Sequence, residues 1–347
     1  MDNKLKTTNL FKYATKELSQ DAFICWLLSH ATEDGWNEEP KLRECAIDFM
    51  NHILSAKNIT WQENDRIEAI ERQHKKIDVL LKFRKYYIII EDKTFTKTHD
   101  DQINRYKQIL IKEEIDENNI ICVFYKIEEQ PKPEDNVDYE FTREILLEIY
   151  RKYKNTITNP IFNDYLDYLE FIDKETKAYT YRPIDEWTRS TYIGLFSDLK
   201  ATYLKDRSFG WDYVSNKSGG FMGLWWYDFY TCEELINMGL DNSVCTNLYL
   251  QIENSKIAVK YSMMDIKNAD YQTIKGKRNQ IRSCLINEFN IGFEKFTSAK
   301  GKAMTVGFLN YDESNYKEQL EKLSSAMLEL KRYKFLNDTY TYIKGEN

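Results

Sequence analysis

Asp78, Glu91 and Lys93 are the residues of this sequence whose types and spacing are best suited to chemistry. Asp78 interrupts one apolar run, and Glu91 directly follows another. Because side chains alternate between the faces of a strand, Glu91 and Lys93 share a face, whereas Asp92 points to the opposite one. Asp78 is an isolated acid among apolar neighbours on the preceding strand, and we expect it to reach the face of Glu91 and Lys93. The pattern predicts two carboxylates and an amine at one sheet edge.

Such a group of side chains is typical of a metal-dependent phosphodiesterase. Two carboxylates with a backbone carbonyl and water form the oxygen-rich site that suits Mg²⁺, with Mn²⁺ as its substitute, and such ions stabilise the charge of an in-line displacement at phosphorus. Lys93 would position or deprotonate the attacking water and offset the developing negative charge. No two of the four histidines lie at ligand spacing, so a zinc hydrolase is the weaker choice.

The elements that must position these residues alternate between helix and strand. Helical spacing predicts helices at residues 8–31, 40–56, 99–112, 141–154 and 160–175, and short β-branched or apolar runs predict strands at 67–71, 77–81, 86–90 and 120–125. The first part of this order is helix, three strands, helix and strand. It predicts an α/β fold, an αβββαβ core with a mixed sheet whose last crossover is of the βαβ type.

A second domain is expected after a polar stretch near residues 174–182, which places the boundary between a catalytic domain, 1–178, and a domain of unassigned role, 179–347. Its predicted helices are 185–203, 270–289 and 313–334, and its predicted strands are 211–214, 221–230, 248–253, 257–261 and 303–309. This order predicts an α+β domain with an antiparallel sheet. We expect it to recognise substrate, a partner or a signal.

Asp78, followed across a hairpin by Glu91-Asp92-Lys93, resembles the signature of the PD-(D/E)XK nuclease superfamily, which is an acid, a hairpin and then E-x-K. Ile77 stands in place of the proline of the family name, which is commonly missing in the superfamily and is not a ligand. The resemblance implies a restriction-endonuclease-like fold. It also implies that Asp78 and Glu91 are metal ligands, that the backbone carbonyl of Asp92 is a further ligand, and that Lys93 is the catalytic lysine.

The stretch ELSQDAF at residues 17–23 is similar to the opening helix of an uncharacterised bacterial branch of the superfamily. A helix-borne acid often completes the metal site there, which implies Glu17 as a ligand. Asp21 is the substitute, because residues four apart share a helix face. The resemblance covers about residues 8–127 and implies nothing about residues 180–347.

Gln102 and Tyr106 match the Q-x-x-x-Y pattern that follows E-x-K in related nucleases. They are expected to contact substrate or to support the lysine. The proposed polymer is a nucleic acid, DNA rather than RNA, although the net charge of −7 requires a local basic surface for binding. The basic residues expected near the motif are Lys75, Lys76, Lys97, Arg105 and Lys107.

Composition bounds the remaining expectations. No apolar run approaches the length of a membrane span and the N-terminus lacks a signal-like stretch, so no membrane association and a cytoplasmic location are expected. The six cysteines are widely spaced and are expected to be reduced.

A homodimer is expected only on mechanism, because cutting both strands of a duplex with one site per chain is easiest in a symmetric pair. The resemblance implies a role in restriction, repair, mobile elements or antiphage defence.

Three other interpretations remain open for the same residues. The charged group is alternatively a solvated surface ion-pair cluster, which is the usual role of an isolated E-x-K. The chain is alternatively a non-catalytic nucleic-acid-binding, sensor or complex subunit that uses a nuclease fold. It is alternatively a phosphohydrolase acting on nucleotides. Stabilisation by divalent metal distinguishes the binding subunit from the enzymes, and the choice of substrate distinguishes the two enzymes.

Overall fold

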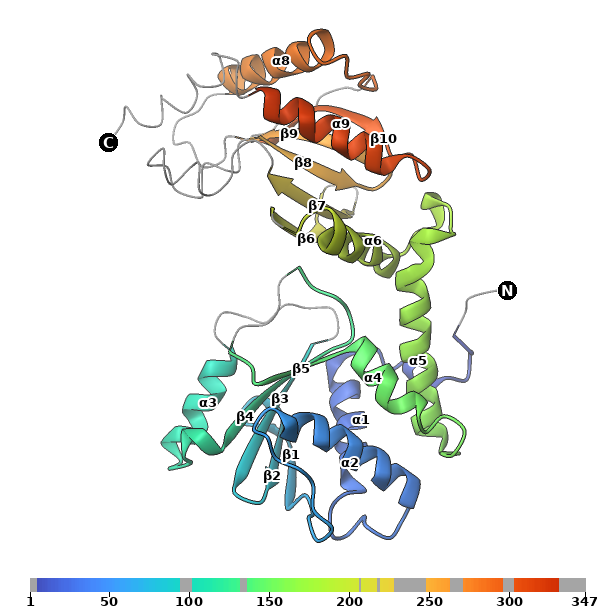
Figure 1. The fold of residues 1–347 in the computed structure, drawn as a ribbon, viewed down its shortest axis with the longest axis vertical. Helices are drawn as coiled ribbons and strands as arrows, with labels where there is room; N and C mark the ends of the chain where they lie inside the picture. The colour runs from blue at the N-terminus through green and yellow to red at the C-terminus, as the bar shows by residue number, and fades with distance from the viewer. Residues whose placement is uncertain are drawn as a thin grey trace. The chain divides into compact units, whose positions relative to one another are not determined.

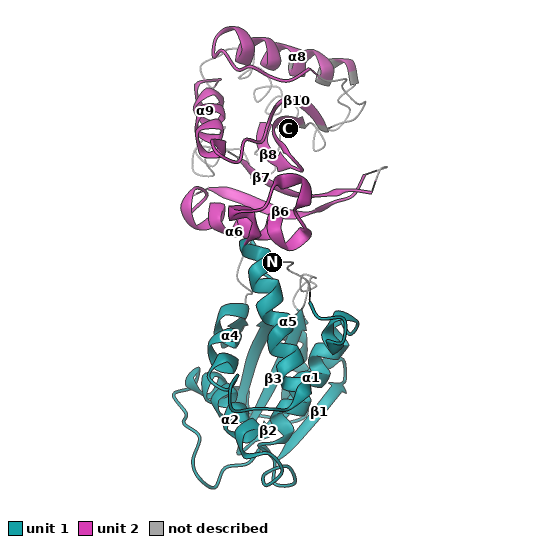
Figure 2. Cartoon of the chain, turned by 90° about the vertical axis from the view of Figure 1, so that its right-hand side faces the viewer, with its two compact units in different colours: residues 1–177 teal, residues 178–347 magenta. Residues whose placement is uncertain are grey.

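The computed structural model describes residues 5–93, 102–131, 136–205, 207–216, 219–227, 248–262, 271–295 and 303–330 (Figure 1). The chain divides into two units, Met1–Lys177 and Ala178–Asn347 (Figure 2). Within the described ranges, no helix is both long enough and apolar enough to cross a membrane. Cys25, Cys45, Cys122 and Cys284 are not in disulfide bonds, whereas Cys232 and Cys245 lie outside the described residues.

A mixed five-stranded sheet forms the centre of unit 1, with the order β1-β2-β3-β4-β5. The first three strands pair antiparallel, and β3, β4 and β5 pair parallel. The strands are β1 (Ala69–His74), β2 (Ile77–Phe83), β3 (Tyr86–Lys93), β4 (Ile120–Lys126) and β5 (Tyr139–Thr142). The predicted αβββαβ core with a mixed sheet is confirmed, and β5 adds a parallel strand that was not predicted.

Helices cover both faces of this sheet (Figure 1). The core that includes Ile88 and Ile90 packs against four helices, and Ile89 between them contributes to a separate core beneath α3. Central strands that are buried on both faces carry such continuous apolar runs. The helices on the first face are α1 (Glu17–Ser29), α2 (Pro40–Ser55), α4 (Arg143–Arg151) and α5 (Pro160–Lys177); α3 (Gln102–Lys112) covers the second, and η2 (Glu117–Asn119) precedes β4.

The N-terminal segment differs from the single helix predicted at residues 8–31. A short 3₁₀ turn, η1 (Leu10–Lys12), is followed by irregular chain before α1 begins at Glu17. The buried Asn9 donates from Nδ2 to the backbone carbonyl of Asp164, 2.7 Å away, and the Leu10 amide donates to the Asp164 carboxylate at 2.7 Å. These long-range bonds tie the segment to α5, so the chain does not continue as one helix.

Unit 2 is built on a five-stranded antiparallel sheet with the order β10-β9-β8-β7-β6. Its core includes the fully buried Trp226, so this aromatic belongs to the interior. The described elements are η3 (Ala178–Thr180), η4 (Ile184–Glu186), α6 (Arg189–Thr202), β6 (Ser208–Val214), β7 (Phe221–Tyr227), β8 (Leu248–Glu253), β9 (Lys256–Ser262), α8 (Tyr271–Asn287), β10 (Ala303–Asn310) and α9 (Tyr316–Glu329). The predicted antiparallel α+β arrangement is confirmed, and the predicted extensions to residues 230 and 334 lie outside the described residues.

Candidate functional site

The hairpin of β2 and β3 brings Asp78 to Glu91 and Lys93, as the alternation of side chains predicts. Asp78 accepts a hydrogen bond at Oδ2 from the backbone amide of Asp92, 3.1 Å away. Lys93 forms an ion pair with Glu91, and its Nζ lies 3.9 Å from Asp78 Oδ2. Lys93 also donates from Nζ to the backbone carbonyl of Asp92 at 3.2 Å. Two carboxylates and one amine therefore meet at this edge of the sheet.

The group is too deeply buried to be a solvated surface ion-pair cluster. Glu91 is completely buried and Lys93 is 7% exposed. Burial, followed by the charge of Asp78, raises the pKa of Glu91 to about 8 despite the neighbouring ammonium. Burial alone would lower the pKa of Lys93, but the hydrogen bond and charge of Glu91 raise it overall. Lys93 is therefore protonated at neutral pH, and without a metal the Glu91 carboxyl keeps its proton to a higher pH than usual.

Asp92 points to the opposite face of β3, as predicted, where it meets α1. Gln20 of α1 donates from its amide to Asp92 Oδ1, and the Tyr165 hydroxyl donates to Gln20 Oε1 at 3.1 Å. The hydroxyls of Tyr165 and Tyr125 lie 2.7 Å apart and share a hydrogen bond. Burial and then the charge of Asp21 raise the pKa of Asp92 well above its usual range. This buried network fastens α1 and α5 to the back of the strand that carries the site.

Both candidate acids of α1 lie at the site. The buried Asp21 accepts a hydrogen bond at Oδ2 from Gln73 Nε2, 3.2 Å away, and the same nitrogen donates to Asp78 Oδ1 at 3.1 Å. Burial and then the charge of Asp78 raise the pKa of Asp21 to about 6. Glu17 is partly buried, and its negative charge helps to raise the pKa of Lys93. The direct hydrogen-bond bridge to Asp78 runs from Asp21.

Gln102 and Tyr106 of α3 lie together beside the same carboxylates. The Gln102 amide donates to the Tyr106 hydroxyl at 2.6 Å. Tyr106 packs into the core between α3 and the sheet, and its pKa is raised by burial first and then by the charges of Glu91 and Asp78. The predicted pair is thus positioned near the site by one helix face.

Two residues at the site were missed by sequence reasoning. Lys126 ends β4 and pairs in register with Lys93 on the parallel neighbour strand. It is 6% exposed, so a second buried lysine accompanies Lys93 at the sheet edge. The sequence could have indicated Lys126 in the same way as Glu91, because each is a charged residue that directly follows an apolar strand. Gln73, the second missed residue, has no comparable signal because its place depends on the conformation of the hairpin.

The carboxylate oxygens of the site are chemically suited to bind a hard divalent cation. In the described part of the chain, Asp21 Oδ1 and Glu91 Oε2 are buried carboxylate oxygens of the site without a hydrogen-bond donor. Such oxygens are the ligands that Mg²⁺ and Mn²⁺ prefer. No group of three His, Cys, Asp or Glu side chains among the described residues is already arranged to hold a metal. Gln73 and the Asp92 amide each donate one hydrogen bond to an oxygen of Asp78. A carboxylate offers about four acceptor sites, so each Asp78 oxygen can accept its hydrogen bond and still coordinate a cation.

The basic side chains predicted to meet a phosphate backbone are only partly available. They are Lys75, Lys76, Lys97, Arg105 and Lys107. Lys75 pairs with Glu113, and Lys107 pairs with Glu117 at 2.8 Å. Lys97 lies outside the described residues, and the other two are exposed. Two of the predicted positive charges are therefore offset by acids of the same unit.

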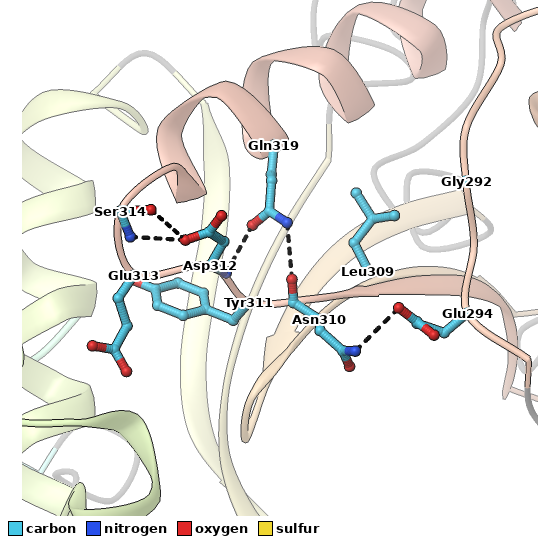
Figure 3. A pocket seen from close by; sticks show the side chains of 9 residues that line it. All are labelled: Gly292, Glu294, Leu309, Asn310, Tyr311, Asp312, Glu313, Ser314 and Gln319. Atoms are coloured by element: carbon cyan, nitrogen blue, oxygen red, sulfur yellow. Dashed lines mark hydrogen bonds between the residues drawn. The ribbon is translucent and has the colours of Figure 1, made fainter.

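A recess in unit 2 offers a different environment (Figure 3). Its lining includes three acids, Glu294, Asp312 and Glu313, and no lysine or arginine. Its polar groups largely satisfy one another: Asn310 donates to Glu294 at 3.1 Å, and the Gln319 amide donates to the Asn310 carbonyl at 2.8 Å. An acidic, internally bonded surface repels phosphate, so this recess is a poor site for nucleic acid.

Comparison with known families gives one match. The model of a family described as the PD-(D/E)XK nuclease superfamily matches residues 8–194, which is more than half of the chain. The matched range contains every residue of the site described above. No curated protein and no solved structure matches the chain significantly.

Proposed function

Because this chain belongs to the PD-(D/E)XK nuclease superfamily, we propose that it is a Mg²⁺-dependent nuclease that hydrolyses phosphodiester bonds within DNA. The observation that carries the proposal is the contact of Lys93 with buried Glu91 beside Asp78. An ammonium and two carboxylates at one edge meet the requirements for binding a cation and a phosphate together.

In this proposal Asp78, Glu91 and the backbone carbonyl of Asp92 hold Mg²⁺, for which Mn²⁺ substitutes. The bound ion supplies positive charge at the phosphate and lowers the pKa of bound water. Lys93 is protonated, because Glu91 raises its pKa. It therefore orients the attacking water by donating a hydrogen bond and stabilises negative charge on the phosphate, rather than accepting the first proton. This argument favours a positioning role for the amine over the role of a general base.

The remaining assignments rest on less direct support. Gln102 and Tyr106 would contact the substrate or support Lys93, because α3 places them beside the carboxylates. Unit 2 would recognise substrate, a partner or a signal. The choice of DNA and a role in restriction, repair or antiphage defence are supported by the family. A homodimer is supported by the need to cut both strands of a duplex. A cytoplasmic location stays the expectation from the sequence.

The test is cleavage of plasmid, linear duplex, single-stranded DNA and RNA by the full chain with Mg²⁺ or Mn²⁺. Glu91→Gln should abolish cleavage and Lys93→Met should lower its rate by about 10²- to 10³-fold, with each variant shown to be folded under the assay conditions. A matched control is Glu170→Gln, since Glu170 pairs with Lys154 at 2.6 Å as an acid–lysine pair of α5 and the preceding turn. The control should cleave normally. A folded, unaltered protein that leaves every polymer intact would contradict the proposal.

A second candidate function is a non-catalytic nucleic-acid-binding or sensor subunit. It is favoured by the hydrogen bonds that Gln73 and the Asp92 amide donate to the two Asp78 oxygens, because they hold this carboxylate in place in the folded protein without a metal. A metal that binds only the folded state must raise the melting temperature. Melting that is indifferent to Mn²⁺, together with retained nucleic-acid binding, would favour this candidate over the nuclease.

A further inference from the structure

Gln73 has a backbone conformation that its place in the hairpin does not require. The β1–β2 turn consists of Lys75 and Lys76, whose positive φ angles of 49° and 75° suit a two-residue turn of type I′. Gln73 lies outside this turn, yet its φ is 58°. Left-handed backbone at a non-glycine residue carries a conformational cost and is concentrated at functional sites. We therefore expect the Gln73 side chain to make contacts that offset the cost of this backbone conformation.

That side chain joins three elements of unit 1. The ladder pairs that flank Gln73 place it opposite Asp78 on β2. Its Nε2 uses both hydrogens, donating to Asp78 Oδ1 at 3.1 Å and to Asp21 Oδ2 of α1 at 3.2 Å. One amide nitrogen thus fixes the separation of two carboxylates that come from different parts of the chain.

The bridge preserves the negative charge of the pair. A lysine or arginine at this place would neutralise the acids, whereas an amide is neutral and only orients them. Asp21 Oδ1 is buried without a donor among the described residues. The neighbouring Asp92 carboxyl lowers the pKa of Asp21 as a hydrogen-bond partner, so a cation at Asp21 would compete with the proton of Asp92. Two oriented carboxylates, joined by a neutral amide rather than by a cationic side chain, attract a divalent cation.

We propose that Gln73 is a positioning residue whose amide holds Asp21 against Asp78 so that these two carboxylates bind the same divalent cation. The inference rests on the proposed function and deepens it, because it identifies Asp21, rather than Glu17, as the acid of α1 that acts with Asp78. Groups that orient ligands in this way contribute about 10- to 100-fold to metal affinity in other proteins.

The experiment is calorimetric titration of the full chain with Mn²⁺, which reports affinity independently of cleavage. Gln73→Met removes the donor at similar length, and its affinity should fall about tenfold or more. Gln73→Asn keeps an amide that is one methylene too short, while asparagine tolerates left-handed backbone better than glutamine. This variant should melt at the same or a higher temperature and still bind Mn²⁺ more weakly. Full affinity in Gln73→Asn would mean that only the hairpin conformation matters and would overturn the inference.

Two further variants assign the acid. Asp21→Asn should weaken Mn²⁺ binding at least as much as Gln73→Met, and Glu17→Gln should weaken it less. The reverse order, or unchanged affinity in Gln73→Met, would overturn the proposal. Failure of the nuclease proposal looks different: the unaltered protein would bind Mn²⁺, lose affinity in the Gln73 variants, and cut no nucleic acid. Absence of Mn²⁺ binding by the unaltered protein would overturn the shared site itself.

Discussion

Replacing Glu91 by glutamine should change the dependence of protein stability on pH when no divalent cation is present. Glu91 is completely buried, and burial followed by the charge of Asp78 raises the pKa of its carboxyl from 4.5 to about 8. Between these values the folded protein keeps a proton that the unfolded chain releases. The stabilising contribution of protonated Glu91 is therefore fully present below about pH 4.5 and is lost as the pH rises through about 8.

The size of the effect follows from the shift. At about 1.4 kcal/mol per pKa unit, the change from 4.5 to about 8 corresponds to on the order of 5 kcal/mol in the free energy of unfolding. Glutamine has nearly the shape of the protonated carboxyl but cannot ionise, so Glu91→Gln removes this dependence. Lys93 loses its closest acid in the variant and keeps its bond to the Asp92 carbonyl at 3.2 Å. Losing this ion pair lowers the free energy of unfolding, but it does not reproduce the pH dependence that ionisable Glu91 causes.

The assay is urea unfolding of unit 1 in the full chain with a chelator present, from about pH 5 to about pH 9. The variant should lose less stability than the unaltered protein across this range, and the difference should grow with pH. Glu170→Gln is the control. Burial alone would raise the pKa of Glu170, but Lys154 and Arg151 lower it overall. Glu170 therefore titrates below the pH range of the assay. Parallel stability curves for the unaltered protein and Glu91→Gln would refute the argument.

Three further predictions concern the site and its supports. Lys93→Met should lower the cleavage rate about 10²- to 10³-fold with little change in KM, and a near-normal rate would remove Lys93 from the chemistry. Tyr165→Phe removes the donor to buried Gln20 and should lower the free energy of unfolding by about 1–3 kcal/mol in urea titration. Arg143→Met leaves Glu129 without its buried partner and should destabilise the protein by about 3 kcal/mol; an unchanged melting temperature would contradict this.

The arrangement of the site on β3 could be predicted because it depends on local pattern. The apolar run before Glu91 identifies a buried strand, and alternation then separates Glu91 and Lys93 from Asp92. The structure has this division, with Lys93 paired to Glu91 and Asp92 bonded to α1. The order of elements in unit 1 follows equally from changes of hydrophobic period along the chain.

Features that depend on distant partners could not be predicted in the same way. The break between η1 and α1 depends on Asn9 and Asp164, which are far apart in sequence. The four-residue strand β5 is too short to show a period, and its pairing with β4 defines it. Gln73 reaches the site with a left-handed backbone conformation that its sequence does not predict. The two carboxylates that it bonds lie on α1 and β2.

The middle residue of the E-x-K segment has a structural role that bears on the site. Asp92 faces away from Lys93 and accepts a bond from Gln20, which directly precedes Asp21 in α1. Consecutive residues of a helix point in directions about 100° apart, so fixing Gln20 against the back of β3 also fixes where Asp21 points. Gln73 of β1 then joins Asp21 to Asp78 of β2. The position of the helix acid is thus determined by two contacts, because Gln20 holds α1 to Asp92 of β3 and Gln73 holds Asp21 to Asp78 of β2.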